Sequence, residues 1–465
     1  MTVSGIPNLP PGPSGHWAFG NRRAFAENPL TFLQTCARDY GDVVMIGATT
    51  YLLTAPAVIG TVLSDDGTLY GKSDPDRRAR QAVFPASVMN SAGSDWQRKR
   101  HALQPAFRAA LIRDDIAQAA AATQTMLREH SETEPAPDMR VLMTELCARL
   151  GAGFLLGDPT QAPHLLRMLP MVDAILEETR GRCETPIWWL GARKRRARRA
   201  RNALQVALER ILVQRPDHPP RTASVLALLL TEDPQGRSAW CRDEVAAMLM
   251  SALEPMAAGL TWTLLLLAQH SQTAQAVADE AETALAGAGP DADSIERFPL
   301  ARACVKEAMR LYPPAWLTAR VARHDTMLNG FSVPLGTRLL VSPWVVHRDP
   351  RHFHDPDAFA PARWLGEAAS PSPPRYTYLP FGGGPRSCIG SMLSLSQMTV
   401  VVAILLRART LHLAADARPA VMPALVLRPL DVRIALRTRQ TRAAGIPHAD
   451  IAAIRTVASS PHSPG

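Results

Sequence analysis

The chain has 465 residues, 46% hydrophobic and 20% charged, which is typical of a globular protein with a large core and excludes a disordered chain. The formal net charge is +9, and the basic residues are nearly all arginine, since lysine occurs at only four positions. Because this basic excess is not interleaved with aromatic and glycine residues, we expect no nucleic-acid partner.

Residues 1–20 are rich in proline and glycine and predict an extended surface lead. They contain no signal peptide, and the chain has no run of 18 apolar residues, so we expect no transmembrane anchor. No linker divides residues 21–440, which predicts one large domain. Residues 441–465 lack apolar periodicity and predict a flexible tail.

Helices and a few strands are predicted within that domain. Alternating apolar residues predict a small β-hairpin over 42–46 and 51–54, and a further sheet segment over 336–341. Most of the interval 97–312 has the spacing of amphipathic helices instead. The predicted fold class is therefore mainly α, of the α+β kind, with a small β-rich region.

The run 193–201 holds seven arginine and lysine residues in nine positions, and helical apolar spacing follows it. The simplest interpretation is a solvated helix face. The alternative is a surface that contacts an anionic partner or a membrane.

An unusual pair, Glu254 and Pro255, lies inside a helical stretch over 250–262. Proline removes one N–H donor and crowds the carbonyl four residues back, which costs about 3 kcal/mol in a regular helix. Ser251 precedes Pro255 by four residues and therefore lies on nearly the same face, whereas Thr261 is turned away.

A glycine-rich run over 381–390 presents Cys388 between an arginine and a glycine. Three consecutive glycines allow a tight turn with positive φ, so backbone N–H groups can point at a negatively charged sulfur. A thiolate held this way suits haem iron, where it favours cleavage of an O–O bond. The other five cysteines are scattered without a CxxC pair, which favours a reducing cytoplasm.

The run 381–390 resembles the haem-binding loop of the cytochromes P450, whose pattern Phe-Gly-x-Gly-x-Arg-x-Cys-x-Gly it matches at every fixed position. The resemblance covers about residues 10–440 and is to soluble bacterial members close to the microsomal and fatty-acid-hydroxylating enzymes. It implies the P450 fold, a helix-rich triangular prism with a small β-rich region. It also implies haem b as the cofactor, with Cys388 as the axial iron ligand.

The resemblance implies further haem contacts, residue by residue. Trp96 and Arg100 match a Trp-x-x-x-Arg pair that directs an indole N–H and a guanidinium at the haem propionates. Arg320 and Arg386 match two more propionate positions. The implied cofactor-binding residues together are Trp96, Arg100, Arg320, Phe381, Gly384, Arg386 and Gly390.

Glu307 and Arg310 are three residues apart on a predicted helix, so they share one face and can pair. With Arg363 they resemble the family's Glu-x-x-Arg helix and its later arginine, a buried charge triad behind the haem. The implied role is structural, because losing one member would leave a buried charge unpaired at roughly 3 to 5 kcal/mol. The stretches 347–350 and 355–359 also match the family.

The family's distal helix usually carries an acid followed by an alcohol, which deliver protons on the oxygen side of the haem. Here Glu254 supplies the acid, Pro255 replaces the alcohol, and Ser251 or an ordered water could substitute for it. The preferred function is a monooxygenase with this rerouted proton path, because a carboxylate in a dry helix is costly without a task.

Two other functions stay open. The first is a peroxide-dependent or O2-independent haem-thiolate enzyme, such as a peroxygenase, isomerase or dehydratase, since a proline at position 255 resembles branches of the family with those activities. The second is a non-catalytic haem protein that binds a ligand.

The resemblance implies insertion of one oxygen atom from O2 into a hydrophobic small molecule, such as a terpenoid, fatty acid or polyketide of secondary metabolism. Electrons are expected from an external ferredoxin or flavodoxin-type donor, which could dock near Arg98 and Lys99 unless these lie on a merely solvated face. We expect a cytoplasmic monomer. The substrate pocket is expected to include part of the segment 74–94 and Ala252, Pro255, Met256, Ala315 and Trp316.

Overall fold

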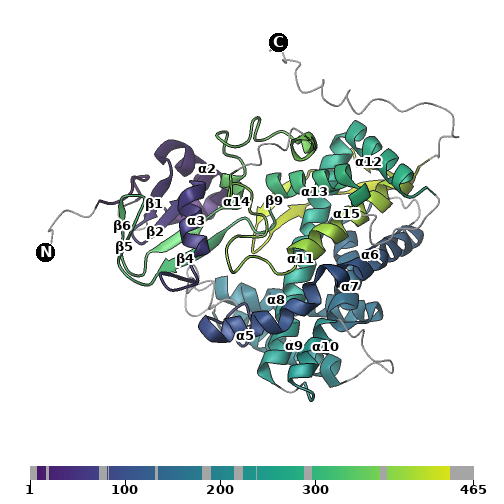
Figure 1. Cartoon of the computed structure of the whole chain (residues 1–465), viewed down its shortest axis with the longest axis horizontal. Helices are drawn as coiled ribbons and strands as arrows, with labels where there is room; N and C mark the ends of the chain where they lie inside the picture. Colours follow the sequence, from purple (N-terminus) through teal and green to yellow (C-terminus); the bar gives the residue numbers. More distant parts are fainter. Residues whose placement is uncertain are drawn as a thin grey trace, which may run out of the picture.

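The computed structural model describes residues 8–16, 20–72, 81, 83–130, 135–180, 190–213, 224–236, 238–286, 296–366 and 374–439. The expected tail 441–465 and part of the expected pocket segment 74–94 lie outside the described residues. In Figure 1 a small β-rich part lies on the left, and helices fill the right and the bottom of the view. This helix-rich arrangement with a minor β region confirms the predicted fold class.

Long helices build the larger part of the molecule around one central helix, α11. Their bounds are α5 Gly93–Leu103, α6 Ala109–Glu129, α7 Met139–Leu156, α8 Ala162–Arg180, α9 Leu190–Val213, α10 Val225–Glu232, α11 Ala239–Gln269, α12 Ser271–Ala284, α13 Pro299–Leu311 and α15 Ser391–Ala408. Helix α11 is buried over most of its length and packs against α7, α13 and α15. It therefore forms the middle of the helical core.

Local sequence sets where these helices begin and end. Ser238 caps α11, because its hydroxyl accepts the Cys241 N–H at 3.1 Å. Helix α13 has Pro299 in its first turn, where a missing N–H costs nothing, and ends before Pro313. Helix α7 ends at Gly157, whose φ of 77° places it in the left-handed region.

The β-rich part centres on one five-stranded sheet with the order β1-β2-β7-β4-β3. Strands β1 and β2 form the predicted hairpin, and β7 is the predicted later sheet segment, so both predictions are confirmed. The strand bounds are β1 Val43–Gly47, β2 Thr50–Leu53, β3 Tyr70–Lys72, β4 Thr318–Ala322, β5 Thr326–Leu328, β6 Phe331–Val333, β7 Arg338–Val341, β8 Arg409–Leu413, β9 Ala420–Pro423, β10 Leu427–Leu430 and β11 Ile434–Thr438.

Shorter helices complete the described chain. They are α1 Arg22–Glu27, α2 Pro29–Tyr40, α3 Pro56–Ser64, α14 Pro343–Val346 and the single-turn segments η1 Gln104–Phe107, η2 Pro159–Gln161 and η6 Pro361–Trp364. Figure 1 shows α2, α3 and α14 beside the five-stranded sheet. The β-hairpin of β9 and β10 reaches back to the helical core, where Trp262 of α11 donates its indole N–H to the Leu427 carbonyl at 3.0 Å.

Two described helices, α11 and α15, are long and apolar enough by composition to cross a membrane. Most of the apolar window of each is buried inside the protein, 78% for α11 and 67% for α15. Such burial is typical of core helices of a folded domain, and both helices contribute to the largest hydrophobic cluster.

Candidate active site

The glycine-rich run forms a closed loop directly before α15. The Phe381 carbonyl accepts the Cys388 N–H at 2.9 Å, and the Gly384 carbonyl accepts the Ser387 N–H at 3.0 Å. Gly384 has a φ of 70°, and a Cβ there would lie under 3.0 Å from the Leu63 carbonyl oxygen of α3. Only glycine fits this position, so α3 and the loop are held in direct contact.

Cys388 lies three residues before the start of α15, and its surroundings shift the pKa of its thiol in opposite directions. Its side chain has accessible surface, yet the surrounding protein desolvates the sulfur, and this desolvation raises the pKa of the thiol. The Gly390 N–H and the Arg100 guanidinium act in the other direction and lower that pKa. Arg100 is fixed beside the loop by donating to the Ser387 carbonyl at 3.0 Å.

Arginines from three distant parts of the chain gather beside the cysteine loop. Burial, together with the positive charges of Arg320, Arg323 and Arg100, lowers the pKa of Arg386 to about 10. The Arg386 guanidinium lies 4.5 Å from the centre of the Trp96 ring. The structure thus brings the four expected propionate-binding residues together.

Arg323 is an additional member of this group that the sequence analysis did not assign. It follows β4 directly, three residues after Arg320, and the second arginine of that short stretch was the available signal. Mutually repelling guanidinium groups are stabilised by an anionic partner, and two carboxylates suit them. The glycine cradle, the cysteine and this cationic group fit haem b.

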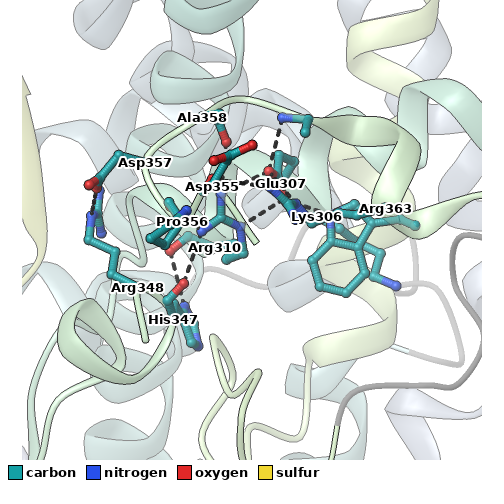
Figure 2. A network of polar contacts seen from close by, with 12 residues as sticks. Lys306, Glu307, Arg310, His347, Arg348, Asp355, Pro356, Asp357, Ala358 and Arg363 are labelled. Carbon is teal, nitrogen blue, oxygen red and sulfur yellow. Dashed lines mark hydrogen bonds and ion pairs between the residues drawn. The ribbon is translucent and has the colours of Figure 1, made fainter. Parts of the chain in front are cut away.

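The Glu307 carboxylate, fully buried on α13, accepts hydrogen bonds from five donors, as Figure 2 shows in part. Arg310 donates to it through Nε and Nη2, both at 2.9 Å, and Arg363 donates through Nε at 2.9 Å. The Trp364 indole N–H and the Ala360 N–H complete its shell at 2.8 and 3.0 Å. The structure therefore places the three expected triad members in one buried network.

His347 connects this network to the segment that leads into the cysteine loop. Its Nδ1 donates to the Arg310 carbonyl at 3.1 Å, and its Nε2 accepts the Leu379 N–H at 2.9 Å. Burial lowers the pKa of His347 to about 3, so the ring is neutral. The sequence analysis noted residues 347–350 only as a family match and did not assign this connection.

Helix α11 runs without interruption through Pro255. The exposed Ser251 uses its hydroxyl locally, donating to the Ala247 carbonyl at 2.7 Å and contacting the Met89 sulfur at 3.4 Å. Hydroxyl groups in helices commonly bond back to the preceding turn in this way. The expected substitute for the missing alcohol is therefore already engaged.

Glu254 has an ionic partner that the sequence analysis did not foresee. Arg428 of β10 pairs with the Glu254 carboxylate through Nε and with Asp173 of α8 through Nη2, the latter at 3.1 Å. The presence of a carboxylate at position 254 is therefore no evidence by itself for a role in proton delivery. An ion pair that joins α11, α8 and β10 gives Glu254 a structural reason to be present.

The expected pocket residues occupy different environments. Ala252 and Pro255 are half-buried and Met256 is buried on α11, whereas Ala315 is exposed. Trp316 packs in the cluster of α2 and the five-stranded sheet, and its indole N–H donates to the Ala424 carbonyl at 2.8 Å. Within the described residues, Trp316 thus joins the sheet to the β9–β10 hairpin.

The two residues named for donor docking differ as well. Arg98 is exposed on α5, but Lys99 is only 6% exposed and donates to three oxygen atoms. A solvated face is therefore wrong for Lys99, because the neighbouring segment over 84–91 covers it. The expected basic run 193–201 lies on α9 and is mostly exposed there.

Comparisons with known proteins agree with this geometry. A family model described as cytochrome P450 matches residues 10–435. Cyclooctatin synthase and cyclooctat-9-en-7-ol 5-monooxygenase of Streptomyces melanosporofaciens are each 29% identical, over 84% and 83% of this chain and 87% and 85% of their own. Pentalenene oxygenase of Streptomyces avermitilis is 27% identical over 90% of this chain and 95% of its own.

Proposed function

Because the chain belongs to the cytochrome P450 family, we propose that it inserts one oxygen atom from O2 into a terpenoid of bacterial secondary metabolism. The chain is an oxygen-incorporating oxidoreductase, and proteins of its family bind haem b through a cysteine thiolate and need O2, an organic substrate and an electron donor. Two similar proteins are named for oxygenation of cyclooctat-9-en-7-ol and pentalenene. These names support the terpenoid class.

The observation that carries the proposal is the cysteine loop together with its arginines. Cys388 would hold the haem iron, and Arg100, Arg320 and Arg386 with Trp96 would hold the propionates. Phe381, Gly384 and Gly390 would shape the loop around the ligand. When bound, the haem supplies the iron at which O2 is reduced and activated.

Glu254 is the residue that we propose for proton transfer. Its side chain is 20% exposed, so its carboxylate can exchange protons with solvent. Arg428 orients the Glu254 carboxylate through their ion pair. Ser251 is less suited, because its hydroxyl proton is directed at the Ala247 carbonyl.

The apolar and half-buried side chains of α11 would face the substrate. Ala252, Pro255 and Met256 offer no hydrogen-bond donor, which suits a hydrocarbon. We propose in addition a cytoplasmic monomer that receives electrons from a ferredoxin or flavodoxin-type protein. The basic net charge of +9 supports an acidic donor.

One pair of measurements tests the function. The reduced carbon monoxide complex is expected to absorb at the red-shifted position typical of thiolate ligation, and a spectrum typical of histidine ligation would contradict the role of Cys388. Turnover of a terpene hydrocarbon is expected with O2 and a redox pair. Equal turnover with peroxide alone would favour a peroxygenase, and turnover that needs neither would favour an isomerase or a dehydratase.

A further inference from the structure

The segment 84–91 bridges α11 and the cysteine loop, the two elements that carry the proposed proton-transfer residue and the proposed iron ligand. At Met89 it contacts α11, where the Met89 sulfur lies 3.4 Å from the Ser251 hydroxyl oxygen. At Ser91 it contacts the cysteine loop, where its carbonyl accepts from Arg386 at 3.1 Å. A segment that touches both walls is well placed to control which molecules reach the iron.

Two carboxylates of α11 hold the backbone of this segment. Asp243 accepts the Ala86 N–H at 2.6 Å, and Glu244 accepts the Val88 N–H at 2.7 Å. The same Oε2 of Glu244 also accepts the Trp240 indole N–H at 3.0 Å. Charge-assisted hydrogen bonds of this kind are about twice as strong as neutral ones.

Lys99 of α5 holds the segment from the other side. Its Nζ donates to the Ala86 carbonyl at 2.7 Å and to the Ser91 hydroxyl at 2.9 Å. Asp95 neutralises the ammonium at 2.8 Å. The segment is therefore bound on one side by the Lys99 ammonium of α5 and on the other by the Asp243 and Glu244 carboxylates of α11.

Internal hydrogen bonds close the segment 84–91 on itself. The Phe84 carbonyl accepts from the Asn90 side-chain amide at 2.8 Å and from the Ser87 hydroxyl at 3.1 Å. Because the loop is closed on itself, its position depends on the few groups that hold it from outside. Loss of the Glu244 contact would consequently displace the whole loop and not only Val88.

A buried carboxylate such as Glu244 costs more free energy of desolvation than a purely structural contact to Val88 would require. It is fully buried, and among the described residues its Oε1 has no hydrogen-bond partner. The pKa of Glu244 is raised to about 7: burial is the main cause and the Asp243 charge adds to it, whereas the hydrogen bonds from Val88 and Trp240 and the charge of Lys99 oppose the shift. The Arg98 guanidinium lies 5.1 Å from the centre of the Trp240 ring, the ring whose N–H Glu244 accepts.

We propose that Glu244 is a positioning residue that, with Asp243 and Lys99, holds the segment 84–91 over the haem site and so limits the access of ligands to the iron. The inference rests on the proposed haem function and adds a specific set of residues to it. It also predicts a direction with pH. Below neutrality Glu244 gains a proton, its two hydrogen bonds weaken, and the segment opens more often.

A nitrogen ligand tests this inference in the holoenzyme. Binding and release of 4-phenylimidazole are followed by stopped-flow absorbance between pH 6 and pH 8, and binding rates are expressed per concentration of neutral ligand, because the protonated imidazole cannot bind iron. In the wild type both rates are expected to rise about three- to tenfold as the pH falls. Glu244→Gln keeps an acceptor for Val88 without the charge, so its rates should be fast and independent of pH.

The matched control is Glu280→Gln. Glu280 is also a buried carboxylate with a raised pKa, but it holds the N–H groups of Leu300 and Ala301 at the start of α13, at 2.7 and 3.0 Å. This variant should lose stability without changing the rates for 4-phenylimidazole. Glu244→Ala is a second variant, expected to be at least as fast as Glu244→Gln.

The outcomes separate this inference from the proposed function. If the wild type shows neither thiolate spectrum nor nitrogen-ligand shift, the proposed function fails. If both are present but Glu244→Gln keeps the wild-type rates and their pH profile, as Glu280→Gln is expected to do, the inference is overturned and Glu244 is only a structural anchor.

Discussion

At the scale of single residues, Gly384 is the most constrained position of the cysteine loop, because both its positive φ and its contact with the Leu63 carbonyl exclude a Cβ. We expect Gly384→Ala to cost about 3 to 5 kcal/mol and to prevent stable haem binding. Haem content after purification and the reduced carbon monoxide spectrum measure this.

Gly382 is the matched control for that substitution. Its φ of 73° is equally left-handed, but a Cβ there would have open space around it. Gly382→Ala should therefore cost only the backbone strain, about 1 to 2 kcal/mol, and keep the haem. Equal losses in the two variants would mean that contact with α3 does not matter.

Substitution of Glu307 is expected to affect the stability of the protein. Glu307→Gln replaces acceptor oxygens with an amide that cannot face Arg310 and Arg363 together, and we expect a loss of roughly 3 to 5 kcal/mol in the free energy of unfolding. Urea unfolding measures it. The exposed pair of Arg23 and Glu27 is the control, and Glu27→Gln should cause no measurable change.

His347 predicts a pH dependence of stability. Its folded pKa of about 3 lies below the ordinary value of 6.5, so its stabilising contribution is complete above pH 6.5 and is lost as the pH falls toward 3. The unfolding free energy should fall by about 1.4 kcal/mol per pH unit through this side chain. Urea unfolding at pH 7, 6 and 5 should show a shallower slope for His347→Gln.

His412 provides the comparison for that slope, because its side chain is exposed on β8. His412→Gln should keep the wild-type dependence on pH. A His347→Gln variant as steep as wild type would assign the acid loss of stability to the carboxylates instead.

The sequence predicted two kinds of contact: those between residues a few positions apart, and those that belong to the family motif. Glu307 and Arg310 are on one helical turn, and the glycine run announces the turn around Cys388. The partner of Glu254 could not be found in this way, because Arg428 is brought to α11 only by the folding of a distant hairpin. The burial of Lys99 depends likewise on a segment without regular periodicity.

At the scale of elements, α11 combines a proline with an unbroken helical path. Pro255→Thr restores an N–H donor and adds the missing alcohol. We expect a higher melting temperature and a larger share of electrons ending in product in place of released peroxide, measured as product formed per NADPH consumed by a reconstituted redox chain. Pro255→Ala is the control, since it restores the N–H without the alcohol and should change the melting temperature only.

Unchanged coupling in Pro255→Thr would show that the proton path does not need a hydroxyl at this position. The proposed route through Glu254 alone would then be sufficient. Higher coupling in both variants would instead attribute the effect to the shape of the helix.

Three strands of the five-stranded sheet were predicted from the sequence, but the order of the strands was not. Alternation identified the β1–β2 hairpin and β7. The parallel pairing of β2 with β7 and the insertion of β4 between β7 and β3 are set by packing between distant parts of the chain. Sequence periodicity carries no information on which distant strands meet.

At the scale of the whole molecule, the net charge of +9 affects how an electron donor approaches. With an acidic ferredoxin, we expect the second-order rate of haem reduction to fall roughly tenfold between 20 and 200 mM salt, because screening shortens the reach of the attraction. Stopped-flow reduction under carbon monoxide measures it. A rate that does not depend on salt would show that the net charge does not determine which electron donor binds.

The five-stranded sheet also bears on how the chain is made. Leu53 pairs with Val341, and the loop that carries Cys388 lies against Leu63, so residues of the first hundred wait for partners from the last third. A ribosome adding 5 to 20 residues per second needs about 15 to 60 seconds to supply them. Until then the hairpin of β1 and β2 has an open edge, and a chaperone that covers it during translation would protect the nascent chain while the haem has no place to bind.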